Sequence, residues 1–514
     1  MHNMRHTTLW TFLLSSWIPF SLANPQIRPP SNPFLKRNLP NSSNPLEVDL
    51  GYAGYAGVYD VPNSLKYWYG IRYGQVPIGD LRWQISTPPE TIFDGTFAIA
   101  ATYPSQCPQG LCHLSTPEPI QPVGSEDCLF LNVWAPENAT DLPVFVWIHG
   151  DGYGYGNAQF DMPFLLNATV NKYVIVDIQY RLGAYGFLAG DEVYKHGTTN
   201  AGLYDQYPAL QWVQKYISLF GGDPDRVTIG GISAGLFLAL NSATCADRTN
   251  FEDPFHCLVE QDTQVLMDAN WNISYGAKYG EWAFLPVTDN KFVQQRPSEQ
   301  LVKEQRERRR NVRLAKRHTE DDFVDFVHYL FPQFMDEQFE AVLAQYSIPA
   351  DIPTVRFATD GLNKNATANF NLYAETTFDC PAYWMAEGFN MKDGQSYKYQ
   401  VSIINSLHGE DETVYLNTFG SVNYLAPSFR DSFISMLDSF FTNGTPNNSS
   451  CYSSDVPADV ATVLSSWPSY TVDGPCQAIL NQTGGTLATS VDLGDAMHMR
   501  IILPTILSLA WLLF

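Results

Sequence analysis

Residues 200–235 read NAGLYDQYPALQWVQKYISLFGGDPDRVTIGGISAG, and this stretch decides the fold. PALQWVQKYISLF (208–220) has apolar residues at helical spacing, and VTIGGIS (227–233) is a β-rich run. The run ends in GISAG (231–235), which fits the G-x-S-x-G turn that carries a serine nucleophile between a strand and a helix. A glycine-rich strand end is the alternative interpretation of the same letters. We take Ser233 as the candidate nucleophile.

Two further runs indicate the sheet around this turn. VFVWIHG (144–150) and YVIVDIQY (173–180) are continuous and β-rich, as expected of strands that are buried on both faces. Strands that alternate with helical patterns predict an α/β fold with a central, mostly parallel sheet flanked by helices. We expect one such domain over residues 45–490.

Two loops supply candidates for the rest of a catalytic site. WIHGDGYGYG (147–156) follows a strand and is dense in glycine, so its backbone N–H groups can approach a developing oxyanion. A hairpin turn is the alternative, although the preceding strand is of the buried parallel type. His408 lies in a polar loop after the strand-like SYKYQVSII (396–404). It is the candidate general base, and a surface histidine is the alternative.

The two ends of the chain indicate export. A basic start, an apolar stretch and small residues at Ser21 and Ala23 predict a signal peptide over 1–23, and the Pro- and Asn-rich 24–44 predicts a flexible leader. The hydrophobic tail at 491–514 fits a GPI-attachment signal, with a buried final helix as the alternative. We therefore expect an extracellular protein, attached to the membrane at the cell surface if the tail acts as an anchor signal.

Modification and composition agree with that location. Nine asparagines begin N-x-S/T sequons, which predicts a glycoprotein: Asn41, Asn138, Asn167, Asn272, Asn365, Asn443, Asn447, Asn448 and Asn481. Eight cysteines in an exported chain favour disulfides, and none has the spacing of a metal site. The net charge of −23 argues against nucleic acid as a partner. We expect no cofactor and no metal.

Several stretches together resemble the type-B carboxylesterase/lipase family, the cholinesterase-like α/β hydrolases that include extracellular fungal esterases and lipases. The matching stretches occur in family order, and EDCLFLNV and GISAG are the most specific of them. They include YWYGIRYGQVPIGDLRWQ (67–84), SQCPQ (105–109), EDCLFLNVWAP (126–136), VFVWIHGDGYGYG (144–156), DIQYRLGAYGFLA (177–189), FDCPAYWMA (378–386) and HGEDETVYLNTFG (408–420).

The resemblance implies an exported serine hydrolase that cleaves small-molecule or lipid carboxylic esters by acyl transfer. By position, it makes Ser233 the nucleophile and His408 the general base, and it gives the oxyanion hole to the backbone N–H groups of Asp151, Gly152 and Ala234.

The resemblance also implies disulfide pairs. It joins Cys107 to Cys128 and Cys245 to Cys257, and it leaves Cys451 or Cys476 as the mate of Cys380.

Four departures from the family pattern bear on activity. Ile232 replaces a glutamate and Asp151 replaces a glycine. After Gly235 the chain reaches Cys245 at once, so on the order of 50 family positions are absent, and the loss of an interior strand would leave strand edges unpaired. A basic run at 303–318 stands where the family's acid motif, N-x-x-E-G, is expected.

We therefore assign no catalytic acid. Misread splice junctions explain the last two departures, and divergence explains them equally well. In the second case the chain is a catalytically impaired, carboxylesterase-like binding protein of the cell surface.

Overall fold

The computed structural model describes residues 44–110, 122–232, 254–276, 283–291, 293, 327–328, 336–345, 395–401, 410–416, 427–446, 469–471, 477–483 and 486–491, with a few single positions between them. The signal peptide, nearly all of the leader and all but the first residue of the hydrophobic tail lie outside this part. None of the helices described is long and apolar enough to cross a membrane.

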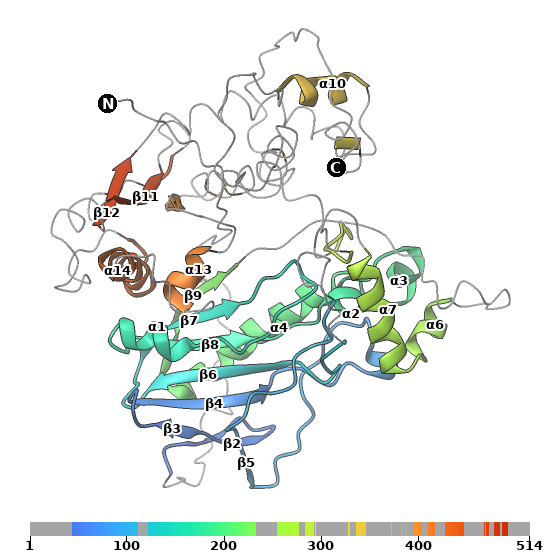
Figure 1. Ribbon diagram of the computed structural model, residues 1–514. Coiled ribbons are helices and arrows are strands. Elements are labelled where there is room, and N and C mark those ends of the chain that lie inside the picture. Colours follow the sequence, from blue (N-terminus) through green and yellow to red (C-terminus); the bar gives the residue numbers. More distant parts are fainter. Residues whose placement is uncertain are drawn as a thin grey trace.

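Six strands form the central sheet in the order β3-β4-β6-β8-β7-β9 (Figure 1). Their bounds are β3 (Val58–Asp60), β4 (Leu65–Arg72), β6 (Phe130–Pro136), β7 (Leu142–Ile148), β8 (Val174–Ile178) and β9 (Gly222–Gly231). β7 pairs in parallel with both β8 and β9. The strands expected over 144–150 and 173–180 are thus confirmed as β7 and β8.

The other half of this sheet is antiparallel. β3 pairs with β4, β4 with β6 and β6 with β8, each in antiparallel register. β3 and β4 are joined by only four residues, 61–64, and so short a link permits antiparallel pairing and no parallel crossover. The described sheet is therefore mixed, and its parallel half is the half that carries the candidate site.

Two small sheets and a set of helices complete the described structure. The sheets comprise β1 (Glu47–Asp49), β2 (Gly54–Ala56) and β5 (Phe97–Ile99), and β10 (Tyr399–Val401), β11 (Ala478–Thr483) and β12 (Thr486–Val491). The helices are α1 (Met162–Ala168), α2 (Gly183–Phe187), α3 (Asp191–His196), α4 (Ala201–Tyr216), α6 (Pro254–Val259), α7 (Thr263–Tyr275), α10 (Asp336–Gln345), α13 (Glu410–Leu416) and α14 (Pro427–Asn443), with 3-10 turns at η2 (Gly79–Leu81) and η3 (Ile217–Phe220).

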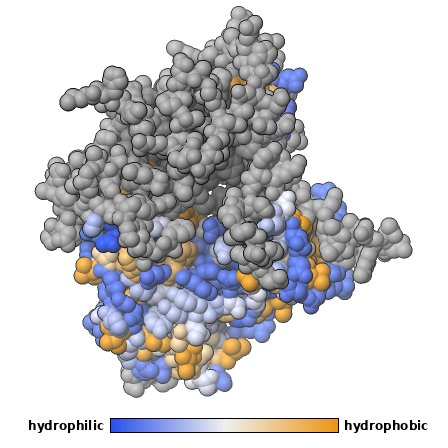
Figure 2. Space-filling view, viewed as in Figure 1, coloured by the Kyte–Doolittle hydropathy of each residue, from blue (hydrophilic) through white to orange (hydrophobic). Residues whose placement is uncertain are grey.

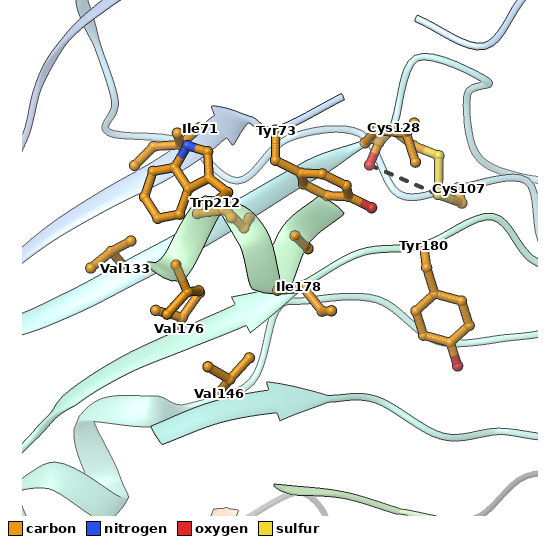
Figure 3. Close-up of a cluster of buried hydrophobic side chains, with 14 of the residues drawn as sticks. Ile71, Tyr73, Cys107, Cys128, Val133, Val146, Val176, Ile178, Tyr180 and Trp212 are labelled. Carbon is orange, nitrogen blue, oxygen red and sulfur yellow. Dashed lines mark hydrogen bonds between the residues drawn. A yellow bond between two sulfur atoms is a disulfide. The ribbon is translucent and has the colours of Figure 1, made fainter. Parts of the chain in front are cut away.

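The continuous apolar run of β7 serves two cores, because successive side chains of a strand point to opposite faces. Val144 and Val146 join a core with Trp212 of α4, which we call the α4 face (Figure 3). Phe145 and Trp147 join a second core with α13 and α14, which we call the α14 face. The ring of Phe145 stacks on Phe441 of α14 at 4.5 Å.

Helix α4 begins seven residues before the predicted start at 208. Pro208 favours the first turn of a helix, yet here it lies inside one. A proline has no N–H to donate to the carbonyl four residues earlier, and that carbonyl, on Tyr204, accepts a hydrogen bond from the Ser86 hydroxyl at 3.5 Å. The helix continues through the proline, and the last predicted residues, 217–220, form η3.

Strand β9 is paired on one side only among the described strands, with β7. The segment that follows it, 233–253, lies outside the described residues. The helix expected after Gly235 and the inferred loss of core elements lie there too, and both stay predictions.

Large apolar side chains are also exposed at a few surface positions, among them Val61, Ile92 and Ile99. On the described surface in Figure 2, hydrophobic residues occur in small groups among hydrophilic ones. Scattered exposed apolar residues of this kind are ordinary on a protein surface, and they need no binding partner to explain them.

Candidate active site

The candidate site lies where two parallel strands end together. Ile148 of β7 is paired with Gly231 of β9, so the glycine-rich loop and the serine turn both begin at one rung of the sheet. The two segments touch, because a Cβ built on Gly150 would clash with the carbonyl oxygen of Ile232. Ser233 follows Ile232 directly. In open α/β sheets, ligands bind at the carboxyl ends of such strands.

Three of the site residues predicted from the sequence, Ser233, Ala234 and His408, lie outside the described residues. Asp151 and Gly152 lie within them. Cys245 and the side chain of Cys257 are also outside, as are Cys380, Cys451 and Cys476, so these pairings stay predictions. The structure contains the Cys107–Cys128 disulfide that the resemblance implies, with 5.0 Å between the two Cα atoms.

The loop after β7 has an unusual backbone. Asp151, Gly152 and Tyr153 have φ angles of 68°, 59° and 58°, a left-handed conformation that favours glycine. The carbonyl of Asp151 accepts hydrogen bonds from the N–H groups of Gly154 and Tyr155, at 3.2 and 3.1 Å. The parallel pairing of β7 excludes the hairpin interpretation of this segment.

Consecutive backbone donors of this loop have no acceptor among the described residues. They are the N–H groups of Asp151, Gly152 and Tyr153. Most backbone N–H groups of a folded protein are paired, so adjacent free donors at a strand end, of which Asp151 and Gly152 come first, are an arrangement suited to an anion. The Asp151 side chain reaches solvent, although the surrounding protein raises the pKa of its carboxyl group.

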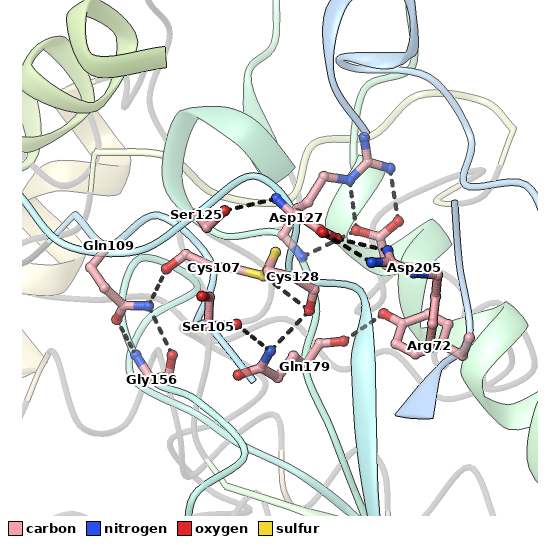
Figure 4. Close-up of a disulfide and its surroundings, with 12 residues drawn as sticks. Arg72, Ser105, Cys107, Gln109, Ser125, Asp127, Cys128, Gly156, Gln179 and Asp205 are labelled. Carbon is pink, nitrogen blue, oxygen red and sulfur yellow. Dashed lines mark hydrogen bonds and ion pairs between the residues drawn. A yellow bond between two sulfur atoms is a disulfide. The ribbon is translucent and has the colours of Figure 1, made fainter. Parts of the chain in front are cut away.

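Gln109 holds the far end of the loop and was not identified from the sequence. Its Nε2 donates to the carbonyls of Cys107 and Gly156, at 2.7 and 3.0 Å, and its Oε1 accepts from the N–H of Gly156 at 2.7 Å (Figure 4). The next residue, Gly110, donates its N–H to the carbonyl of Gly154 at 2.6 Å. In the sequence, the only sign that Gln109 has a structural role is its position two residues after Cys107 in SQCPQ.

Asn270 of α7 connects the same region to a second loop. Its Nδ2 donates to the carbonyl of Gln109 at 3.1 Å, and its Oδ1 accepts from the N–H of Ala184 at 2.8 Å. The adjacent Gly183 donates its N–H to the carbonyl of Tyr153 at 2.7 Å. The glycine-rich loop is therefore supported from two directions.

His149 is a neutral ring at the start of the loop. It is buried and stacks on Tyr180 with 4.6 Å between the ring centroids. Tyr180 donates its hydroxyl to the His149 carbonyl at 2.8 Å. Burial lowers the pKa of His149 to about 4, so the ring carries no charge at neutral pH.

Buried carboxyl groups approach the site from the α14 face. α13 begins two residues after His408, and its Tyr415 ring meets Trp147 of β7 at 5.9 Å. Burial raises the pKa of Glu412 on this helix well above its usual range, and the carboxyl groups of Asp151 and Asp411 raise it further. Burial likewise raises the pKa of Asp177 of β8, to which Glu412 adds. The element that follows the candidate base thus packs beside the loop.

The apolar residue before the serine is buried. Ile232 is 9 % exposed and belongs to the core of the α14 face, where the family's glutamate would place a charge. Among the described residues, no group of three His, Cys, Asp or Glu side chains is arranged to hold a metal ion.

Comparison with known proteins bears on family and fold. The model of the Carboxylesterase family matches residues 54–242. Over 177 residues, 34% of this chain and 35% of the relative, the sequence is 42% identical to para-nitrobenzyl esterase of Bacillus subtilis. It is 41% identical to human cocaine esterase over 188 residues, 34% of this chain and 32% of that protein. The chain thus spans about a third of the length of these curated relatives.

A fungal relative and a solved structure extend the similarity. Carboxylesterase patB of Penicillium expansum is 27% identical over 346 residues, which cover 50% of this chain and 61% of that protein. The crystal structure of Aspergillus niger EstA superposes with a TM-score of 0.69 over 90% of this chain and 98% of that one, at 23% identity. The fold is the α/β-hydrolase fold, and the carboxylesterase resemblance read from the sequence is confirmed over 54–242.

Proposed function

We propose that the protein is a serine carboxylesterase that hydrolyses small-molecule or lipid carboxylic esters. The observation that carries the proposal is the pair of free N–H groups on Asp151 and Gly152, beside the strand end that leads into Ser233. A tetrahedral ester intermediate needs such donors within reach of the nucleophile. Relatives named as an esterase and as a carboxylesterase support the same reaction class.

In the proposed mechanism, His408 accepts the Ser233 hydroxyl proton while the oxygen attacks the ester carbonyl carbon. The N–H groups of Asp151, Gly152 and Ala234 hold the resulting oxyanion. The intermediate collapses to an acyl-enzyme, and the alcohol leaves with the proton from His408. Water, deprotonated by His408, then releases the acid and restores the serine.

A fluorophosphonate probe tests this proposal directly. We expect the purified protein to be labelled, and Ser233→Ala to abolish labelling. Ser218→Ala, at an exposed serine of η3, is the matched control and should label as wild type does. A folded wild-type protein that takes up no probe would rule the esterase out.

A second candidate is a carboxylesterase-like protein that binds esters without turning them over. It is favoured by the sequence, which has no N-x-x-E-G acid motif where the family carries one. In a serine protease, replacement of the carboxylate that orients the catalytic histidine lowers kcat about 10⁴-fold. Binding of a non-hydrolysable ester analogue by a protein that resists the fluorophosphonate would identify this case.

We also propose that the protein is exported and glycosylated, with a GPI anchor formed at its C-terminus. Asn138, Asn167, Asn272 and Asn443, the sequon asparagines whose side chains are described, are all exposed, which supports glycan attachment. Peptide-N-glycosidase should lower the apparent mass. Phosphatidylinositol-specific phospholipase C should release the protein from cells, and its retention would contradict the anchor.

A further inference from the structure

We propose that Gln109 is a positioning residue for the oxyanion hole, and that it holds the 150–156 loop in the conformation that leaves the N–H groups of Asp151 and Gly152 free. The inference rests on the esterase function proposed above for its catalytic consequence. Its structural content stands on the contacts of Gln109 alone.

The first argument is that the Gln109 side chain forms hydrogen bonds with both backbone groups of Gly156. The N–H and the carbonyl of Gly156 each bond the Gln109 side chain, at 2.7 and 3.0 Å. The side chain is 1 % exposed, so water does not replace these bonds without a cavity opening. Gly156 has φ 108°, and a Cβ there would clash with the His149 ring. The two hydrogen bonds therefore fix a backbone position at which only glycine fits.

The second argument is that Gln109 is itself fixed. The same Nε2 donates to the carbonyl of Cys107, whose side chain forms the disulfide with Cys128. Cys128 immediately precedes the stretch that enters β6 at Phe130, so the disulfide ties Gln109 to the central sheet. The glycine-rich loop is thus held at its start by β7 and at its end, through Gln109, by the strand two places away.

The third argument is geometric. Two free donors act together only if the left-handed run from Asp151 to Tyr153 keeps its shape, and no side chain of the described residues bonds those two N–H groups. The conformation is then set by the hydrogen bonds that the carbonyls of residues 151, 153 and 154 accept and by the two bonds between Gln109 and Gly156, which are the only side-chain bonds to the backbone of residues 151–156 among the described residues. A displacement of about 1 Å at a catalytic group costs on the order of 10²-fold in rate.

Gln179 provides a matched control. It is equally buried, and its Nε2 donates to the carbonyls of Ser105 and Cys128, at 3.0 and 2.9 Å. It braces the same disulfide loop but makes no hydrogen bond to residues 150–156. Replacement of either glutamine by methionine removes the polar contacts and keeps the length of the side chain.

The test compares Gln109→Met with Gln179→Met by hydrogen exchange and by ester kinetics. For Gln109→Met we expect amide exchange in 150–156 to accelerate at least about tenfold, and kcat to fall about 10- to 100-fold with KM changed less than about threefold. Gln179→Met should change the exchange of this loop and kcat far less than Gln109→Met does, because Gln179 makes no hydrogen bond to residues 150–156. Gln109→Glu should recover part of its kcat relative to wild type at the same pH as pH falls, because a protonated carboxyl group accepts from the Gly156 N–H and donates one of the two hydrogen bonds that Nε2 makes.

Equal exchange of the loop in the two methionine variants would overturn the proposal, and so would a wild-type kcat in Gln109→Met. If the wild-type protein hydrolyses no ester, the proposed function fails, and the exchange measurement still decides whether Gln109 holds the loop.

Discussion

On the α4 face of the central sheet a buried cation meets a buried carboxylate, whereas on the α14 face two buried carboxyl groups have no cationic partner among the described residues. Arg181 bonds Asp205 of α4 through both Nε and Nη2, each at 2.7 Å. Asp177 and Glu412 lie opposite, both with strongly raised pKa values. A buried carboxyl group with no cation beside it costs stability, and such groups concentrate at functional sites. The α4 face therefore acts as a scaffold. On the α14 face, buried carboxyl groups near the candidate site lower the stability of the fold.

The largest effect should come from breaking the ion pair of the α4 face. Arg181→Met leaves Asp205 fully buried beside an apolar chain and should lower the free energy of unfolding by about 3–5 kcal/mol, measured by denaturant titration. Arg226→Met removes a half-exposed arginine paired with Asp223 and should cost no more than about 1 kcal/mol. Similar losses in the two variants would contradict the distinction between buried and exposed pairs.

His149, at the start of the glycine-rich loop, should make the protein lose stability in acid. Its pKa in the folded protein is about 4 and in the unfolded chain near 6.5, so the unfolded state binds the proton first as pH falls. The stabilisation is complete above pH 6.5, and about 3 kcal/mol of it is lost as pH falls toward 4. His149→Phe keeps a ring on Tyr180 and should flatten the pH profile of the unfolding free energy over this window.

The control for that profile is His196→Phe, at an exposed histidine of α3, which should keep the wild-type slope. A His149→Phe protein that still loses several kcal/mol between pH 6.5 and 4 would show that another group carries the acid sensitivity.

The α14 face should respond to pH in the opposite direction. The pKa of Asp177 is raised in the folded protein, so its contribution is most favourable below the unfolded value, near 3.9, and is lost as pH rises. Asp177→Asn removes that loss and should stabilise the protein at pH 8 by about 1–3 kcal/mol, with no gain at pH 4, in thermal unfolding. Asp80→Asn, at an exposed position, should change neither value. A gain at pH 8 no larger than at pH 4 would rule out this account.

The smallest effect concerns the loop between the two faces. Asp151 has φ 68°, so Asp151→Gly should relieve backbone strain and raise stability by up to about 1 kcal/mol. Under the proposed function kcat should also rise, most at high pH, where the carboxylate beside the oxyanion is charged. Asp225→Gly, at an exposed strand position, should instead destabilise the protein by about 0.5–1 kcal/mol, because its φ is not left-handed. The melting temperature should therefore rise in Asp151→Gly and fall in Asp225→Gly.

The sequence predicted the α/β architecture and the place of the glycine-rich loop, because both depend on local patterns. The runs at 144–150 and 173–180 are each apolar and continuous, which is enough to identify strands β7 and β8. Helix α4 was placed too late, since a proline usually marks a first turn and the hydroxyl that compensates it comes from Ser86, far along the chain.

The supports of the site were missed for a related reason. Gln109 contacts Gly156, 47 positions away, and Asn270 contacts Gln109 across 161 positions. A buried amide at such a separation has no periodicity or spacing that marks it, and only the folded chain brings its partners together.

The pairing of Ile148 with Gly231 has a consequence for how such a site can change over evolution. The two loops of the site leave adjacent strands at the same rung, so the peptide ladder sets their separation, and side chains contribute little to it. Substitutions within the loops, such as Asp151 and Ile232 here, then alter local chemistry without moving one loop relative to the other. A lineage can therefore exchange loop residues one at a time, and a shift of strand register is the single change that would disturb all of them together.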